Sequence, residues 1–272
     1  MAEYMLNIPE NSTEFNYDGS SVLVHVKQLH KCTKQIGKGY FGEVYSFTID
    51  DPCVIHMAVK NTSILYICME LMATSVATFY QAMHQLPELP PDKLELFVRR
   101  CAYNVTRGLD YLKSKNIVHR DIKPVNILIN KNGEVKLCDF GICGNLSDTE
   151  LDFDDFVGTA MYLPPKPEKC AIQDDMWALG ITLIEIIEGK HPFDSYKSDG
   201  VDPITATWEP KVPTTVSNDA RAFILQLLKK EANERPRSYM DIIKHSFVCN
   251  MTAIPSSDEI DFIRHVINET NK

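Results

Sequence analysis

The spacing of hydrophobic residues changes period once along this chain, and that change limits the possible folds more than any other feature. From residue 33 to residue 69, short runs rich in valine, isoleucine and aromatic residues alternate with glycine or Asp-Pro turns, a pattern typical of β-strands. From Pro91 onward, apolar residues recur at helical spacing. We therefore expect an α+β protein with a small antiparallel β-rich front part and a larger, mainly helical back part.

Several segments of the back part have the pattern of a helix. One of them, residues 176–187, is apolar nearly all round, which predicts a helix buried in the core. The last one begins with Ser256 and Glu259, which have the spacing of a capping box. The expected helices cover about residues 94–112, 176–187, 217–229 and 256–269.

Composition excludes several classes of protein. The 28 basic and 37 acidic residues give a net charge of −9, which argues against nucleic acid or anionic lipid as the main partner. No apolar run approaches the roughly 20 residues needed to cross a bilayer, and the N-terminus lacks the pattern of a secretory signal. The eight cysteines include no C-x-x-C pair, so neither a zinc site nor a disulfide framework is indicated.

Three short segments contain residues that could take part in binding or catalysis. Gly37, Gly39 and Gly42 have G-x-G-x-x-G spacing, but a strand-like "EVYSFTI" follows where a dinucleotide-binding fold needs a helix. A loop closing over phosphates and a plain glycine-rich β-turn both remain open for this segment. The segments "VHRDIKPVNIL" (118–128) and "KLCDFGICG" (136–144) each place charged side chains at the ends of apolar runs.

Taken together and in order, these segments resemble the protein-kinase signature set: the glycine loop, Ala58-Val59-Lys60, His119-Arg120-Asp121 with Asn126, and Asp139-Phe140-Gly141. The resemblance covers about residues 33–247. Within that family, "YICMELMATS", "FVGT" and "DDMWALGITLIEI" are similar to the MAP kinase kinases, which phosphorylate Thr and Tyr in a MAP kinase. The implied two-lobed, protein kinase-like organisation is a flexible tail (1–32), a shortened N-lobe (33–70), a hinge and C-lobe (71–247), and a C-terminal tail with a short helix (248–272).

The resemblance also implies roles for individual residues. Asp121 would accept or orient the proton of the substrate hydroxyl, and Lys123 would contact the transferred phosphate. Asn126 and Asp139 would hold Mg²⁺, which suits oxygen ligands of this kind. The residues implied to bind ATP are Ile36, Gly37, Lys38, Gly39, Gly42, Val44, Ala58, Lys60, Met69, Glu70, Met72 and Cys138.

The same resemblance implies partners and a location. The expected substrate is a MAP kinase and the expected activator is a MAP kinase kinase kinase, with no role for nucleic acid or membrane. The cytoplasm is the expected compartment, with the nucleus as a further one.

The chain departs from the family after Lys60. The family places a helix, which carries a glutamate partner for this lysine, and a further strand between the lysine and the hinge. Here Met69 follows Lys60 by nine residues, and residues 61–63 are too few for a helix and a strand. We therefore expect turnover far below the ordinary kinase range. A pseudokinase or scaffold that binds cascade partners, and a splice variant, are the alternatives.

The segment after the third motif departs as well. The family pattern places phosphorylatable residues at Ser147 and Thr149, whereas Asp155 stands where a second one is expected. The acidic residues there either mimic phosphate in part or form a solvated loop. Further on, Lys166 replaces the glutamate that pairs in the family with the counterpart of Arg235, so we expect repulsion between these two cations, relieved if Glu168 takes the glutamate's place.

Overall fold

A computed structural model describes the chain in part, and in the strands before Met69 it describes the backbone. The chain divides into two compact units, Met1–Met72 and Ala73–Lys272, and each is treated by itself. The residues described are 12–17, 20–25, 32–39, 42–49, 55–61, 66–146, 158–167, 171–194 and 207–270.

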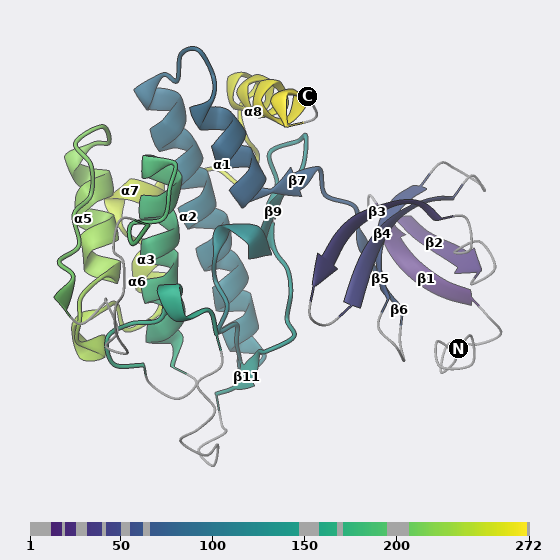
Figure 1. The fold of residues 1–272 in the computed structure, drawn as a ribbon. Helices are drawn as coiled ribbons and strands as arrows, with labels where there is room; N and C mark the ends of the chain where they lie inside the picture. The colour runs from purple at the N-terminus through teal and green to yellow at the C-terminus, as the bar shows by residue number, and fades with distance from the viewer. Residues whose placement is uncertain are drawn as a thin grey trace. The chain divides into compact units, whose positions relative to one another are not determined.

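Unit 1 contains a four-stranded antiparallel sheet, drawn in Figure 1 as the group of arrows labelled β3 to β6. The strands follow one another in chain order, and the register pairs Val44 with Lys60 and Ala58 with Met69. Valine, isoleucine and aromatic residues favour such pleated strands. The strands are β3 (Cys32–Gly39), β4 (Gly42–Ile49), β5 (Ile55–Asn61) and β6 (Tyr66–Glu70).

The connection between β5 and β6 confirms the short gap read from the sequence. Strand β5 ends at Asn61, strand β6 begins at Tyr66, and these two residues are paired partners in the sheet. Four intervening residues span about one helical turn at most, which leaves no room for a packed helix followed by a strand. The lysine-bearing strand therefore leads almost directly into the strand that ends at Glu70.

A second pair of strands lies within the expected N-terminal tail. Strands β1 (Ser12–Tyr17) and β2 (Ser20–His25) form an antiparallel pair in which Tyr17 faces Ser20. This stretch lies in the expected flexible tail (1–32), whose flexibility stays a prediction. The sequence did hold a signal, because Asp-Gly, which stands between the two strands, is among the dipeptides that favour a tight hairpin.

Unit 2 is mainly helical, as the change of period predicts. Helix α3 is buried along almost its whole length, including Trp177, and it packs against both α2 and α5 (Figure 1). The expected helices all occur, with ends shifted by a few residues. The helices are α1 (Val76–His84), α2 (Pro91–Ser114), α3 (Ile172–Glu188), α5 (Asn218–Leu227), α6 (Tyr239–Ile243), α7 (Ser246–Cys249) and α8 (Ser257–Glu269).

Helix α8 is held to α2 by a buried ion pair. Arg100 donates two hydrogen bonds of 2.7 Å to the two carboxylate oxygens of Glu259 and a third, of 2.6 Å, to the carbonyl oxygen of Thr252. The expected capping box is therefore only half formed. Ser256 accepts a hydrogen bond from the Glu259 backbone N–H, whereas the Glu259 side chain serves the ion pair.

Short strands and turns of unit 2 carry the polar motifs. Strand β9 pairs with β10 and with β7, and β8 pairs with β11, so the segments around residues 119–126 and 138–143 are each joined to a hairpin. Within the described residues, no helix is long and apolar enough to cross a membrane. The short elements are β7 (Thr74–Ser75), β8 (Ile117–Val118), η4 (Pro124–Asn126), β9 (Ile127–Ile129), β10 (Val135–Leu137), β11 (Gly144–Asn145), η5 (Ala160–Tyr162) and η6 (Ala232–Glu234).

Candidate active site

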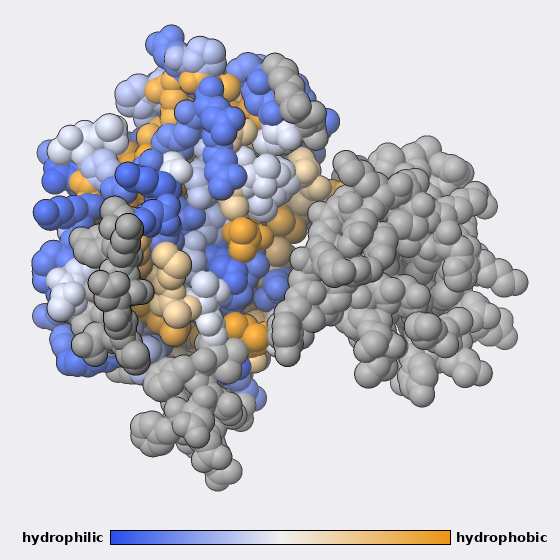
Figure 2. All heavy atoms as spheres, in the orientation of Figure 1, coloured by the Kyte–Doolittle hydropathy of each residue, from blue (hydrophilic) through white to orange (hydrophobic). Residues whose placement is uncertain are grey.

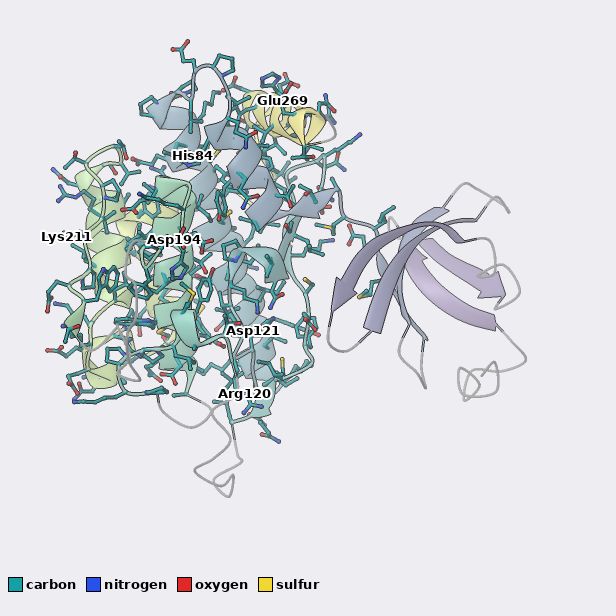
Figure 3. All side chains as sticks on the ribbon, in the orientation of Figure 1. His84, Arg120, Asp121, Asp194, Lys211 and Glu269 are labelled. Atoms are coloured by element: carbon teal, nitrogen blue, oxygen red, sulfur yellow. The ribbon has the colours of Figure 1, made fainter. Side chains whose placement is uncertain are left out.

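The loop after β8 is fixed by a buried carboxylate of helix α3. Asp175 accepts hydrogen bonds from the backbone N–H groups of His119, at 2.9 Å, and Arg120, at 2.8 Å. These bonds hold Arg120 in a left-handed conformation, with φ of 67°, which is costly for a residue with a side chain. This backbone conformation sets the direction in which the chain continues to Asp121. Arg120 and Asp121 are labelled on this loop in Figure 3.

Asp121 is the centre of a closed network of donors. Its Oδ1 accepts a 2.7 Å hydrogen bond from the Thr159 hydroxyl, and its Oδ2 accepts one of 2.7 Å from Asn126 Nδ2. Lys123 Nζ lies 2.8 Å from Asp121 Oδ2 and donates to Thr159 Oγ1 at 2.6 Å. Three of the residues expected at the site are thus brought together, and Thr159 joins them.

This network sets the protonation of Asp121. Burial by itself would raise the pKa of the carboxyl, but the hydrogen bonds from Lys123 and Thr159, the Lys123 charge and the Asn126 amide outweigh it and lower the pKa. The carboxyl is therefore ionised at neutral pH. An oriented carboxylate at the protein surface can accept a proton from a hydroxyl group placed next to it.

Asp139 is held beside Asn126 through the backbone. The Cys138 N–H donates to the Asn126 carbonyl oxygen at 2.9 Å, so the residue before Asp139 is tied to Asn126. Asp139 also has a left-handed φ, of 61°, and Phe140 packs on the His119 ring with centroids 5.3 Å apart. Arg120 Nε donates to the Ile142 carbonyl oxygen at 2.6 Å and so joins the two segments. Strained backbone at both segments is typical of a functional site.

The side chains of Asn126 and Asp139 fit a hard divalent cation. Asn126 uses its amide nitrogen on Asp121, which leaves the amide oxygen as its available metal ligand. An amide oxygen and a carboxylate are the donor types that Mg²⁺ takes, together with phosphate oxygens and water. The chemistry of the donor set therefore agrees with a metal held by Asn126 and Asp139.

The residues expected to bind ATP lie in both units. Met69 is half-buried and Glu70 exposed at the end of β6, Met72 follows them, and Cys138 is half-buried in unit 2. Lys60 stands in β5 between its strand partners Val44 and Ile67. The remaining ones, Ile36, Gly37, Lys38, Gly39, Gly42 and Ala58, lie on β3, β4 and β5.

The expectation of repulsion between Lys166 and Arg235 is wrong. Lys166 is exposed and pairs with Glu231 at 2.8 Å, and this contact lowers the pKa of Glu231. The buried guanidinium of Arg235 lies 3.4 Å from Asp174 and donates to backbone carbonyl oxygens, that of Gln173 among them. Separate carboxylates thus serve the two cations. Glu168 and the candidate regulatory positions Ser147, Thr149 and Asp155 lie outside the described residues.

Sequence reasoning gave no role to two residues that the structure places at the site. Thr159 lies in "FVGT" and Asp175 in "DDMWALG", segments noted only for their resemblance to a family. Thr159 is 38 residues from its partner Asp121, and Asp175 is 55 residues from its partner Arg120. The local sequence pattern therefore gives no sign of these contacts. The one available signal was chemical: an acidic residue in an apolar helix needs a buried partner.

Comparison with known families gives an independent result. The family model described as "Protein kinase domain" matches residues 53–248. The match includes Lys60 and the whole polar site of unit 2, but it begins after the glycine-rich segment at 37–42. The resemblance noted for the glycine-rich segment is therefore not covered by this match.

The curated relatives are named as kinases, two of them as dual specificity mitogen-activated protein kinase kinases. A dual specificity mitogen-activated protein kinase kinase of Caenorhabditis elegans, sek-1, is 36% identical over 68% of this chain and 56% of its own length. Dual specificity mitogen-activated protein kinase kinase 7 of Homo sapiens is 33% identical over 70% of this chain and 46% of its own. Protein kinase wis1 of Schizosaccharomyces pombe is 31% identical over 88% of this chain and 46% of its own. The chain spans about half the length of these relatives.

The alignment with wis1 is longer than this chain. It runs over 284 residues, which is more than the 272 residues of the whole chain. This relative therefore has residues with no counterpart in this chain.

Proposed function

The chain belongs to the protein kinase family, in its MAP kinase kinase branch, and we propose that it transfers the γ-phosphate of ATP to Ser or Thr, and to Tyr, of a MAP kinase. The observation that carries the proposal is the network around Asp121, in which an ionised carboxylate is held by Lys123, Asn126 and Thr159. We further propose an upstream MAP kinase kinase kinase as activator, and the cytoplasm and nucleus as the places of action.

In the proposed reaction, the substrate hydroxyl attacks the γ-phosphorus while the bond between that phosphorus and the bridging oxygen of ADP breaks. Asp121 orients the hydroxyl and accepts its proton, and the Lys123 ammonium stabilises charge on the transferred group. Thr159 keeps the carboxylate aimed by donating to Oδ1. Asp175 contributes by fixing the loop backbone, so it is a positioning residue.

Asn126 and Asp139 would hold Mg²⁺, which supplies neutralisation of phosphate charge when it is bound. Their own contribution is to present one amide oxygen and one carboxylate from segments joined by the hydrogen bond between Cys138 and Asn126. Fixed ligands of this kind need little rearrangement during the reaction, which is how preorganised sites lower a barrier.

The short connection after β5 sets the rate that we expect. Lys60 stands on β5, and four residues connect β5 to β6, too few for the helix on which the family carries the glutamate partner of this lysine. Kinases turn over at about 1–100 s⁻¹, and we expect this chain to fall well below that range. We also expect it to bind ATP, because Asn126 and Asp139 offer the donor types that Mg²⁺ takes together with phosphate oxygens.

The test is a phosphoryl-transfer assay with the purified chain, radiolabelled ATP, Mg²⁺ and a purified MAP kinase as acceptor. We expect slow labelling of the acceptor that Asp121→Asn abolishes. Asp261→Asn is the matched control, because Asp261 is an exposed carboxylate of α8 outside the site, and it should leave the rate unchanged.

A thermal-shift measurement with and without ATP and Mg²⁺ separates binding from transfer. Ligand at 100 times its Kd stabilises a folded protein by about 2.7 kcal/mol, and Asp139→Asn should remove most of the Mg²⁺-dependent part. Binding without transfer would favour the scaffold alternative. If the chain shows no ATP binding and no phosphoryl transfer, the proposal is refuted.

A further inference from the structure

Asn126 and Asp139 stand at the two ends of one β-hairpin. Strand β9 begins at Ile127, directly after Asn126, and strand β10 ends at Leu137, two residues before Asp139. Three residue pairs join the strands, and the hydrogen bond from the Cys138 N–H to the Asn126 carbonyl oxygen closes the open end. A movement of this β9–β10 hairpin therefore moves both proposed metal ligands.

The turn of the hairpin is stiffened by its own hydrogen bonds. Asn130 Oδ1 accepts from the backbone N–H groups of Asn132 and Glu134, each at 3.0 Å. The Asn130 N–H donates to the Glu134 carbonyl oxygen at 3.1 Å, and the Asn130 carbonyl oxygen accepts from the Gly133 N–H at 3.0 Å. Strands of three residues are only about 10 Å long, so a displacement of this stiff turn reaches the end that carries the ligands.

The turn is covered by helix α8 and the residues before it. Gly133 is buried, although Asn132 and Glu134 on either side of it are exposed. A Cβ at Gly133 would lie 2.8 Å from Pro255 Cγ and 3.0 Å from Ile263 Cδ1, so these two side chains cover it closely. The φ of 79° suits glycine and no other residue without strain.

Helix α8 has its own anchorage in unit 2. The buried Arg100–Glu259 pair fixes it to α2, and it also packs against α1 (Figure 1). From this position, Arg264 Nε donates a hydrogen bond of 3.1 Å to the Lys131 carbonyl oxygen in the turn. The turn therefore meets α8 at two points, a packing contact at Gly133 and a hydrogen bond at Lys131.

The opposite end of the hairpin opens to solvent. Asp139 is exposed, and Figure 2 shows hydrophilic side chains among hydrophobic ones around the place where Figure 3 labels Asp121. Helix α2 supports the hairpin near this end, because a Cβ at Gly108 would lie 3.1 Å from Leu137 Cδ1. A displacement of the turn would tilt the hairpin about that contact and change the aim of the ligands.

We propose that Gly133 and Arg264 are positioning residues for the metal site, because the contact of the turn with α8 sets the placement of Asn126 and Asp139. The inference rests on the proposed function, which requires the metal. Groups that orient metal ligands are worth about 10–100-fold in metal affinity. Gly133 acts through the length of the hairpin, so its effect belongs at the lower end of this range.

The test is a titration of the full chain with Mn²⁺ in the presence of a non-hydrolysable ATP analogue, with the free ion followed by EPR spectroscopy. Mn²⁺ takes carboxylate and carbonyl oxygens as Mg²⁺ does, and the measurement needs no phosphoryl transfer. Gly133→Ala forces the turn away from Pro255 and should weaken Mn²⁺ binding about tenfold. Adding Pro255→Ala removes the Cγ atom in the way and should recover part of the affinity.

Gly189→Ala is the matched control. Gly189 also has a positive φ, of 73°, and a Cβ there would lie 2.8 Å from the His84 ring, but the position is at the end of α3 and outside the hairpin. This variant should be destabilised in a similar way, as melting temperatures will show, and should keep the Mn²⁺ affinity of the unmodified chain.

Arg264 provides a second variant with less risk to folding, because its side chain is exposed. Arg264→Leu removes the donor to the Lys131 carbonyl oxygen and should weaken Mn²⁺ binding by less than Gly133→Ala does. Arg264→Lys keeps a donor at the end of a long side chain and should restore part of the affinity.

Amide hydrogen exchange measures the same coupling without metal. The Cys138 N–H closes the ligand end of the hairpin, so its exchange, followed by NMR, reports local opening there. It should be faster in Gly133→Ala than in Gly189→Ala. A loss of global stability alone would speed this exchange to a similar extent in both variants.

The outcomes separate the inference from the function. Equal Mn²⁺ affinity and equal Cys138 exchange in Gly133→Ala and Gly189→Ala overturn the inference and keep the function. An unmodified chain that binds no Mn²⁺ together with the ATP analogue overturns both.

Discussion

Replacement of one partner of the Arg100–Glu259 pair tests whether helix α8 is an integral part of unit 2. Both side chains are at most 5% exposed, and Glu259 receives both of its hydrogen bonds from the guanidinium. Glu259→Leu leaves the Arg100 charge buried, with only backbone carbonyl oxygens of residues 252 and 253 as partners. Removal of one member of a buried ion pair costs about 3–5 kcal/mol.

That loss is large enough for a simple assay. In a unit of this size, each kcal/mol changes the melting temperature by about 2–4 °C, so we expect a decrease of about 10 °C for Glu259→Leu. Thermal unfolding followed by circular dichroism measures it. The double variant Arg100→Met with Glu259→Leu should recover much of the loss, because it removes both charges and leaves an apolar contact.

A neighbouring pair supplies the control. Lys93 of α2 also pairs with α8, through Asp258, but Asp258 is 79% exposed. Exposed pairs contribute about 0–1 kcal/mol, so Lys93→Met should change the melting temperature by only a few degrees. Equal effects of Lys93→Met and Glu259→Leu, or a double variant as unstable as the sum of its single variants, would contradict the reasoning.

Three further predictions concern the site and its support. The pKa of Asp121 is lower in the folded protein than in the unfolded chain. Its carboxylate therefore stabilises the fold at pH values above the unfolded pKa, and this contribution is lost as the pH falls through the folded pKa. Lys123→Met removes a group that lowers this pKa, so the NMR titration of the Asp121 carboxyl should move to higher pH. Asp175→Asn keeps only one acceptor for the two loop N–H groups, so the rate of transfer should fall about 100-fold, measured at saturating ATP. Gly189→Ala places a Cβ 2.8 Å from the His84 ring at a φ of 73°, and chemical denaturation should report a loss of about 1–3 kcal/mol.

Much of the fold could be predicted from local pattern. The segment 176–187 was expected to be a buried helix because it is apolar all round, and α3 is buried in this way. Ser217 and Ser256 were expected to begin helices, and each accepts a hydrogen bond from the backbone three residues later. Such features depend on residues near one another in sequence, which is why a single sequence suffices for them.

Errors arose where distant residues compete for one group. Glu259 has the right spacing to complete a capping box, but Arg100, 159 residues away, takes its carboxylate. Lys166 was expected to repel Arg235, yet Lys166 pairs with Glu231 and Arg235 pairs with Asp174. A charged side chain pairs with whichever opposite charge folding brings near, and its own neighbours in sequence do not reveal that partner.

The sequence by itself determined the identity and order of the reactive groups, from Lys60 through Asp121 and Asn126 to Asp139, and the shortness of the link after Lys60. The folded arrangement was needed to show that Thr159 and Asp175 serve the same loop, and that hydrogen bonds from Lys123 and Thr159 outweigh the effect of burial and lower the pKa of the Asp121 carboxyl. The physical reason is that chemical type belongs to a residue, whereas orientation, burial and protonation depend on groups that arrive from distant parts of the chain.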